Sequence, residues 1–361
     1  MEAEIAPRRT MENEVRFVAK RWNHHSTHSG YDQLVSRLGS AVEPLDLSTL
    51  RHKWIPGRLA VWLATRSGNR LYSYIAFYNE WAAIRDAWAH GTRRIYHVLY
   101  GDDSYFYLAT LGRRRTNRIV ATFHLPPSAL AHYLGTMEHL QRLDGLVVVA
   151  RNQVPFFASM VGPERVFFVP HGVDTNIFVP RPTSPASLRS KGLCLFVGVH
   201  RRDFATLRRV IEVVYAWDRN IRFVIVTAKS NRGIFGELEG ADLRFDIPES
   251  ELIMLYQDAD LLLQPLEDST ANNSVLEGMA CGLPTIVTDI GGVRDYLDES
   301  CGVLVPPGDA EAMAEAVQYL LQNDSMRGQL AAKARERALE FDWSVIAAKM
   351  NRVYSQVLSQ E

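Results

Sequence analysis

Short apolar runs alternate along the chain with longer amphipathic stretches. Runs rich in β-branched and aromatic residues, almost unbroken in apolar character, are typical of strands covered on both faces. In the first half they predict strands at Val15–Lys20, Arg94–Leu99, Arg118–Phe123, Leu146–Ala150 and Val166–Val169. In the second half they predict strands at Leu193–Val197, Arg222–Val226, Leu243–Phe245, Asp260–Leu263, Pro284–Val287 and Gly302–Val305.

Helical periodicity fills the stretches between these runs. The predicted helices are Tyr31–Leu38, Tyr72–Ala89, Ser128–Arg142, Gln153–Val161, Phe204–Tyr215, Glu249–Gln257, Val275–Cys281, Ala310–Leu321, Ser325–Glu340 and Ser344–Leu358. Regular alternation of strand and helix predicts an α/β protein with parallel, doubly wound sheets.

The length of 361 residues suits two α/β domains better than one core. The segment PRPTSPASLRSKG, residues 180–192, has no periodicity and predicts a linker. We therefore expect a flexible tail at 1–13, an N-terminal domain at 14–182 and a C-terminal domain at 183–342. Residues 343–361 should form a helix that crosses back to the N-terminal domain. Two such domains place a ligand in the cleft between the carboxyl ends of their strands.

Composition supports a folded protein with an uneven charge distribution. Hydrophobic residues make up 47% and charged residues 22% of the chain, which excludes disorder for most of it. Residues 1–185 hold 22 Lys and Arg against 15 Asp and Glu, whereas residues 186–361 hold 18 against 26. A basic first half suits an anionic acceptor or a membrane surface, or else two halves that attract each other.

The cysteine pattern and the lengths of the apolar runs indicate the cellular compartment in which the protein is expected. Cys194, Cys281 and Cys301 lack metal or redox spacing and predict reduced, packed thiols. No apolar stretch reaches the roughly 18 residues of a membrane span, and the N-terminus lacks a signal-peptide pattern. We expect a cytoplasmic protein whose membrane contact, if any, is peripheral and made by the basic N-terminal domain.

The candidate chemistry lies between residues 265 and 308. Glu277 sits in an otherwise small and apolar predicted helix. A buried carboxylate costs several kcal/mol unless it is hydrogen-bonded. The preceding loop, Ser269 to Ser274, offers hydroxyls, amides and free backbone N–H groups at a helix N-terminus, which favour an anion. This combination predicts a nucleotide site, with the diphosphate on the helix end and the ribose on the carboxylate.

The same segment resembles the donor site of retaining glycosyltransferases of the GT-B fold, family-4 type, which have two Rossmann-like domains facing across a cleft. Further similar pieces follow in the family's order: ATFHLPP around His124, PHGVDTNIF at 170–178, LFVGVHRRDFATL at 195–207 and FDWSVIAAKMNRVY at the end. The resemblance covers residues from about 120 to the C-terminus and little of the first 110.

The resemblance implies a role for each candidate residue. Glu277 would bind the ribose, His124 would face the donor sugar, and Gly30 would belong to a glycine loop near the phosphates. Ser269, Asn272, Asn273, Ser274 and Val275 would form the donor loop, while Arg201, Arg202 or Lys229 would supply positive charge to the diphosphate. For His124 and the three cations a structural role or a solvated surface charge stays open, as does helix capping for Glu277.

The chain departs from the family pattern at two places. Relatives carry a second glutamate eight positions before the ribose-binding one, and here that position is Ser269, with Glu267 and Asp268 adjacent. Which of these three stands in for the missing acid is open. The loop after the first strand of the second domain also lacks the family's Lys-Gly.

Other features carry weaker signals. Asp102-Asp103 and the pair Asp258 and Asp260 resemble metal-binding carboxylates, but we predict no metal site. The cluster Arg113–Arg115 with Arg118 suits either anionic headgroups or the carboxyl end of a helix. Aromatic residues from Trp54 to Trp88 suit a core or an acceptor pocket.

We therefore predict a metal-independent retaining hexosyltransferase without a cofactor, which uses a nucleotide-diphosphate sugar as donor. The acceptor is a glycan, a glycolipid or a small molecule, and nucleic acid is not expected as a partner. Two alternatives stay open: a non-catalytic relative that binds a nucleotide sugar or a partner protein, and a nucleotide-sugar epimerase or phosphorylase.

Overall fold

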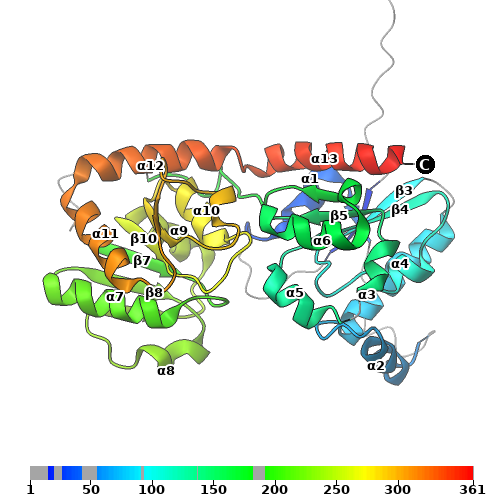
Figure 1. Cartoon of the computed structure of the whole chain (residues 1–361), viewed down its shortest axis with the longest axis horizontal. Helices are drawn as coiled ribbons and strands as arrows, with labels where there is room; N and C mark the ends of the chain where they lie inside the picture. The colour runs from blue at the N-terminus through cyan, green and yellow to red at the C-terminus, as the bar shows by residue number, and fades with distance from the viewer. Residues whose placement is uncertain are drawn as a thin grey trace, which may run out of the picture.

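The computed structural model describes residues 15–19, 27–42, 55–90, 93–135, 137–181 and 192–360. The predicted tail at 1–13, most of the predicted linker and Trp54 lie outside the described residues. Figure 1 shows two lobes side by side, each built around a sheet with helices on both faces. No helix in the described ranges combines the length and apolar character that a membrane span requires.

The sheet of the N-terminal lobe is parallel, with strand order β2-β1-β3-β4-β5-β6. Its strands are β1 (Val15–Val18), β2 (Ser40–Ala41), β3 (Arg94–Val98), β4 (Asn117–Phe123), β5 (Gly145–Val148) and β6 (Val166–Phe168). Its helices are α1 (Val35–Leu38), α2 (Gly57–Arg66), α3 (Tyr74–Ala89), α4 (Leu108–Leu111), α5 (Pro127–Tyr133) and α6 (Val154–Val161).

The sheet of the C-terminal lobe is also parallel, with strand order β12-β11-β10-β7-β8-β9. Its strands are β7 (Leu193–Val197), β8 (Arg222–Val226), β9 (Ala241–Arg244), β10 (Leu261–Gln264), β11 (Thr285–Thr288) and β12 (Val303–Val305). The helices are α7 (Phe204–Trp217), α8 (Arg232–Phe235), α9 (Glu249–Asp258), α10 (Asn273–Ala280), α11 (Ala310–Gln322), α12 (Asp324–Leu339) and α13 (Trp343–Ser359). The predicted α/β class with two doubly wound sheets is confirmed.

The structure differs from the predicted helices at two places, each for an identifiable reason. The single helix predicted at Ser128–Arg142 is wrong: α5 ends at Tyr133, and a separate 3-10 turn covers Glu138–Arg142. Gly135 lies between them, and glycine disfavours the helix interior. Helix α2 is missing from the prediction because its apolar pattern is inverted, with buried Ala60 and a Trp62 that is 52% exposed.

Helix α13 connects the two lobes. It continues from α12 across the top of the molecule and packs on the N-terminal lobe (Figure 1). Trp343, at its start, is fully buried against the rings of Tyr31 and His171. Further along, the Tyr354 hydroxyl lies 2.6 Å from Nδ1 of the buried His97, whose Nε2 lies 2.7 Å from Thr122 Oγ1. Burial lowers the pKa of His97 to about 3, so its ring is neutral in this network.

Replacing Tyr354 by Phe should destabilise the protein by about 1–3 kcal/mol, because it leaves one buried nitrogen of His97 without a partner. Chemical denaturation measures the difference. Tyr319→Phe on α11, where the ring is 52% exposed, is the matched control and should change stability little. Equal effects of the two substitutions would contradict a role for the His97 network in holding α13.

Candidate functional site

The predicted donor loop lies where β7 and β10 end and α10 begins. Asn272 caps α10, and its Oδ1 accepts a hydrogen bond from the Val275 N–H at 3.3 Å. The Ser274 hydroxyl donates to the carbonyl of Val197 at the end of β7, at 3.0 Å. Val275 N–H and the Ser274 hydroxyl are therefore engaged within the protein. The backbone N–H groups of Asn273 and Ser274 have no partner among the described residues, so they are the donors left for a ligand.

Glu277 lies inside α10 and is only 6% exposed. Its two carboxylate oxygens have separate partners: Oε1 accepts from the Ser29 hydroxyl, and Oε2 accepts from the Tyr256 hydroxyl at 2.9 Å. Burial raises the pKa of Glu277 to about 7, although both hydrogen bonds oppose the rise. The carboxyl group is thus satisfied, as its buried position requires, by one residue from each lobe.

Arg202 lies beside the start of α10. Its Nη2 donates to Asn272 Oδ1 at 3.3 Å and approaches the Ser274 hydroxyl at 3.5 Å. Arg202 is half-buried, and no carboxylate pairs with it among the described residues. Desolvation lowers the pKa of its guanidinium to about 10. Gly198, with φ of 147°, allows this approach, because a Cβ there would collide with the guanidinium. A second buried donor, Asn272 Nδ2, has no partner in the described part of the chain.

The other two cation candidates lie differently. Arg201 is half-buried, and no side-chain contact ties it to the donor loop within the described ranges. Lys229 forms an ion pair with Asp246 at 2.7 Å, and its side chain is 74% exposed. The structure therefore brings Arg202 to the start of α10 and leaves Lys229 on the surface.

His124 follows β4 and lies across the cleft from the donor loop. Its Nε2 lies 2.8 Å from the Leu99 carbonyl, and its ring packs against Tyr31 and Tyr100. Burial lowers its pKa to about 4, so the imidazole is neutral and Nε2 is the protonated nitrogen that donates to the carbonyl. The backbone carbonyl of His124 accepts a hydrogen bond from the Thr270 hydroxyl, which places His124 next to the donor loop.

The three candidates for the missing acid differ in their surroundings. Ser269 is buried, and its hydroxyl approaches the Thr270 carbonyl at 3.4 Å. Glu267 is exposed. Asp268 is half-buried, and its Oδ2 accepts a hydrogen bond at 2.6 Å from Ser128, in the first turn of α5 in the opposite lobe. Of the three, Asp268 presents a carboxylate to both sides of the cleft.

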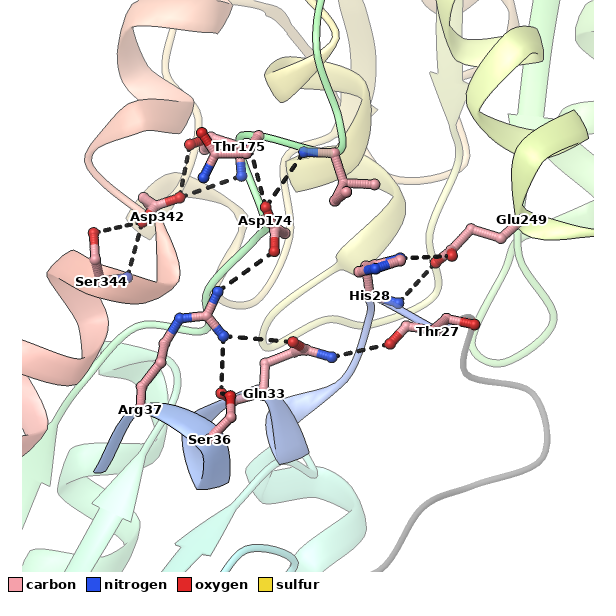
Figure 2. A network of polar contacts seen from close by, with 12 residues as sticks. Thr27, His28, Gln33, Ser36, Arg37, Asp174, Thr175, Glu249, Asp342 and Ser344 are labelled. Carbon is pink, nitrogen blue, oxygen red and sulfur yellow. Dashed lines mark hydrogen bonds and ion pairs between the residues drawn. The ribbon is translucent and has the colours of Figure 1, made fainter. Parts of the chain in front are cut away.

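Direct contacts close the cleft at this site. The loop Thr27–Gly30 reaches α9, where Glu249 accepts from the His28 backbone N–H at 2.8 Å and lies 2.8 Å from its Nδ1. Figure 2 shows this loop joined on its other side to Gln33. The crevice between Ser29, Gly30 and Glu277 has no room for a water molecule.

A chain of polar contacts connects this loop to the start of α13 (Figure 2). Arg37 donates to the Gln33 carbonyl at 3.0 Å and pairs with Asp174 at 3.4 Å. Beside Asp174, the Thr175 hydroxyl donates to Asp342 at 2.7 Å. The loop that covers Glu277 is therefore coupled to the segment that connects the lobes.

Gly30 lines the crevice beside Glu277, and its φ of 108° favours glycine. The partners of Glu277, Ser29 and Tyr256, were not predicted. Neither has a sequence signal, because each lies far along the chain from the residue it contacts. His28 and Glu249 were missed for the same reason.

Comparison with known proteins agrees with this architecture. The family described as Glycosyl transferases group 1 matches residues 191–323. A phosphatidyl-myo-inositol mannosyltransferase of Mycolicibacterium smegmatis is 28% identical over 253 residues, covering 66% of this chain and 65% of the relative. A D-inositol 3-phosphate glycosyltransferase of Xylanimonas cellulosilytica is 28% identical over 258 residues, covering 64% of this chain and 61% of the relative. The match thus spans less than two thirds of either relative.

Solved structures with low sequence identity share the fold. Sucrose-phosphate synthase from Thermosynechococcus elongatus superposes with a TM-score of 0.70 at 18% identity, covering 97% of this chain and 100% of that chain. A glycosyltransferase from Rickettsia africae superposes with a TM-score of 0.68 at 16% identity, with the same coverage. The two sheets facing across a closed cleft define a GT-B protein.

Within that class, the chain is similar to the group 1 glycosyltransferases of family-4 type. The family resemblance of the donor segment is thereby confirmed.

Stability should depend on pH through Glu277. Its pKa is about 7 in the folded protein and 4.5 as its ordinary value, so between these values the folded state holds an extra proton. Stability therefore falls as the pH rises through this window. Glu277→Gln mimics the protonated form. Its free energy of unfolding should rise by about 3 kcal/mol relative to the unsubstituted protein between about pH 4.5 and pH 7, and the difference should stay constant above pH 7. Denaturation of both proteins across this range measures the effect, and a constant difference would contradict it.

Proposed function

We propose that the protein is a retaining glycosyltransferase that transfers a hexose from a nucleotide-diphosphate sugar, without a metal cofactor, to a glycan, glycolipid or small molecule. The observation that carries the proposal is the occurrence, around the start of α10, of two charged groups: Arg202, a half-buried cation without a carboxylate partner among the described residues, and Glu277, a buried carboxyl group. Such a cation lacks the anion that would offset its burial, and a diphosphate supplies one.

The phosphate end of the donor fits the start of α10. The free N–H groups of Asn273 and Ser274, the unpartnered Asn272 Nδ2 and the Arg202 guanidinium all belong to this short region. A helix N-terminus and a guanidinium both favour an anion, and both stabilise the negative charge that develops on a leaving diphosphate. This fixed positive charge is the basis on which we propose chemistry without a metal.

The ribose end fits Glu277, because a carboxylate can accept hydrogen bonds from two neighbouring hydroxyls. In the present arrangement Ser29 and Tyr256 supply hydroxyls to the two oxygens. We propose that the donor ribose takes the place of Ser29, whereas Tyr256 stays to orient the carboxylate. The cleft then has to open before the donor enters, because the crevice beside Glu277 has no room even for water.

The transferred sugar would lie between the donor loop and the carboxyl end of β4. His124 and Asp268 lie there, joined to the opposite lobe by the contacts with Thr270 and Ser128. We propose Asp268 as the acid that replaces the family's first glutamate, and the neutral His124 as a neighbour of the sugar. Retention of the anomeric configuration rests on the family resemblance, in which the acceptor attacks from the face that the diphosphate leaves.

Substitutions of Glu277 and of Arg202 should separate donor binding from turnover. Glu277→Ala should weaken nucleotide binding by about tenfold or more, the size of a lost hydrogen bond to a charged group. Arg202→Gln should lower kcat by about a hundredfold with a smaller change in affinity, because the leaving-group charge is greatest in the transition state. Melting shifts with UDP, GDP, ADP and dTDP sugars, followed by turnover with the active donor, measure both effects.

Two substitutions are matched controls. Glu315→Ala removes an exposed carboxylate of α11, and Arg201→Gln removes the neighbouring cation that does not contact the donor loop. Both should leave binding and turnover nearly unchanged. If no nucleotide sugar shifts the melting temperature of the unsubstituted protein, the donor assignment is wrong and the non-catalytic alternative holds. The anomeric signal of the product in NMR spectra tests retention.

Ser29→Ala should raise nucleotide affinity severalfold, because it removes the hydroxyl that competes for Glu277 and one bond that holds the cleft closed. The control is Ser36→Ala. Among the described residues, the Ser36 hydroxyl donates only to the nearby Gln33 carbonyl. Calorimetric titration with the active nucleotide compares them. A weaker affinity of Ser29→Ala would mean that Ser29 binds the donor rather than competes with it.

A further inference from the structure

A second concentration of positive charge lies at the other end of the N-terminal lobe. A cavity of about 510 Å³ is lined by five arginines and one acid: Arg113, Arg114, Arg115, Arg118, Arg165 and Asp144. Arg118 is the second residue of β4, Asp144 precedes β5 and Arg165 precedes β6. These are the amino ends of parallel strands, whereas the donor cleft lies at their carboxyl ends. His124 follows the end of β4, six positions after Arg118, which corresponds to roughly 20 Å along an extended strand.

Three of the five guanidiniums are held in place by the protein. Arg165 donates to the Val161 carbonyl at 2.7 Å, and Arg118 donates to the Gln360 carbonyl beyond α13 at 2.8 Å. Arg113 donates to the carboxylate of Asp144 at 3.1 Å. Carbonyl groups at helix ends attract cations, so Arg118 and Arg165 have a structural explanation.

Arg114 and Arg115 have no such explanation. Both are exposed, and neither guanidinium has a hydrogen-bond or ion-pair partner among the described residues. Among the described residues, Asp144 is the one acid that lines the cavity, and it already accepts from Arg113 and from the Ile119 N–H at 2.8 Å. Five like charges around a concave surface repel one another unless an anion lies between them. Guanidinium groups match phosphate oxygens with paired hydrogen bonds.

Two exposed apolar side chains, Leu111 and Trp88, form an apolar edge close in sequence to the arginines of this cavity. Leu111, two residues before Arg113, is 44% exposed, and Trp88 is 46% exposed with its Nε1 donating to the Leu111 carbonyl at 2.9 Å. Figure 1 places α4, which ends at Leu111, and the C-terminus at the end of this lobe away from the C-terminal lobe. Exposed Trp and Leu beside arginines suit the boundary between phosphate headgroups and acyl chains.

We propose that this arginine cavity is a second anion site, which binds phosphate groups at the end of the N-terminal lobe opposite the donor cleft. The phosphate comes either from the headgroups of an anionic lipid surface, which the apolar edge favours, or from a free phosphorylated compound. Arg114 and Arg115 contact the phosphate, while Arg113, Arg118 and Arg165 form the walls that the protein already fixes. Binding is electrostatic and weakens as ionic strength rises.

The test uses the full chain and two probes. Co-sedimentation with vesicles of phosphatidylglycerol and phosphatidylcholine in equal parts, against vesicles of phosphatidylcholine alone, measures the lipid arm. Calorimetric titration with inorganic pyrophosphate measures the free-phosphate arm, and it is repeated on Arg202→Gln so that the donor cleft does not contribute. The double variant Arg114→Gln/Arg115→Gln should lose about tenfold or more in affinity for the active probe. Its exposed positions should leave the melting temperature unchanged.

The matched control is Arg219→Gln/Arg232→Gln, which removes two exposed arginines from the C-terminal lobe and the same net charge. It should keep the binding of the unsubstituted protein. Binding to the mixed vesicles alone would mean that the phosphate belongs to lipid headgroups. Binding to pyrophosphate alone would mean that it belongs to a free phosphorylated compound. Failure of both probes to bind, or equal losses in the two double variants, would overturn the site. Neither arm uses a donor sugar, so this result does not depend on the proposed transferase activity.

Discussion

Glu277 is a carboxylate buried at the boundary of two lobes, and the arrangement around the cleft depends on satisfying it. Tyr256, from the same lobe, supplies one hydroxyl, and Ser29, from the opposite lobe, supplies the other. Because an unpaired buried carboxylate is costly, the closed cleft and the satisfied carboxylate occur together. A ligand that offers hydroxyls can replace the residue from the opposite lobe. The Glu277 carboxylate would then keep its hydrogen bonds in both the empty and the occupied site.

The surroundings of Arg202 present the opposite situation. Its contacts are neutral amide, hydroxyl and carbonyl groups, which orient the guanidinium without neutralising it. A cation held in this way is prepared for an anion that is not part of the protein. The two charged groups near α10 therefore differ in their surroundings: both oxygens of Glu277 have hydrogen-bond partners, whereas the Arg202 guanidinium has no carboxylate partner among the described residues.

The lobes are joined by more than the residues of the site. One apolar cluster includes residues of both sheets and of α13, and within it the ring of Trp343 packs against Tyr31. The polar chain through Arg37, Asp174 and Thr175 runs beside it, from the loop that covers Glu277 to the start of α13. Opening the cleft thus has to rearrange a loop whose anchors also hold the connection between the lobes, which couples access to the site with the position of α13.

The sequence by itself determined the two parallel sheets, since apolar runs without a polar face report local burial on both sides. It also singled out Glu277, because a charge in a small apolar helix is conspicuous, and it identified the loop before that helix. It failed at α2, where Trp62 faces outward, and it could not choose between Arg201, Arg202 and Lys229 or between Glu267, Asp268 and Ser269. The tertiary structure places Arg202 beside the start of α10 and Asp268 against the opposite lobe, and it brings Ser29 and Tyr256 to Glu277. The reason is physical: burial and periodicity are properties of neighbouring residues, whereas the partner of a charge is set by how distant segments approach one another.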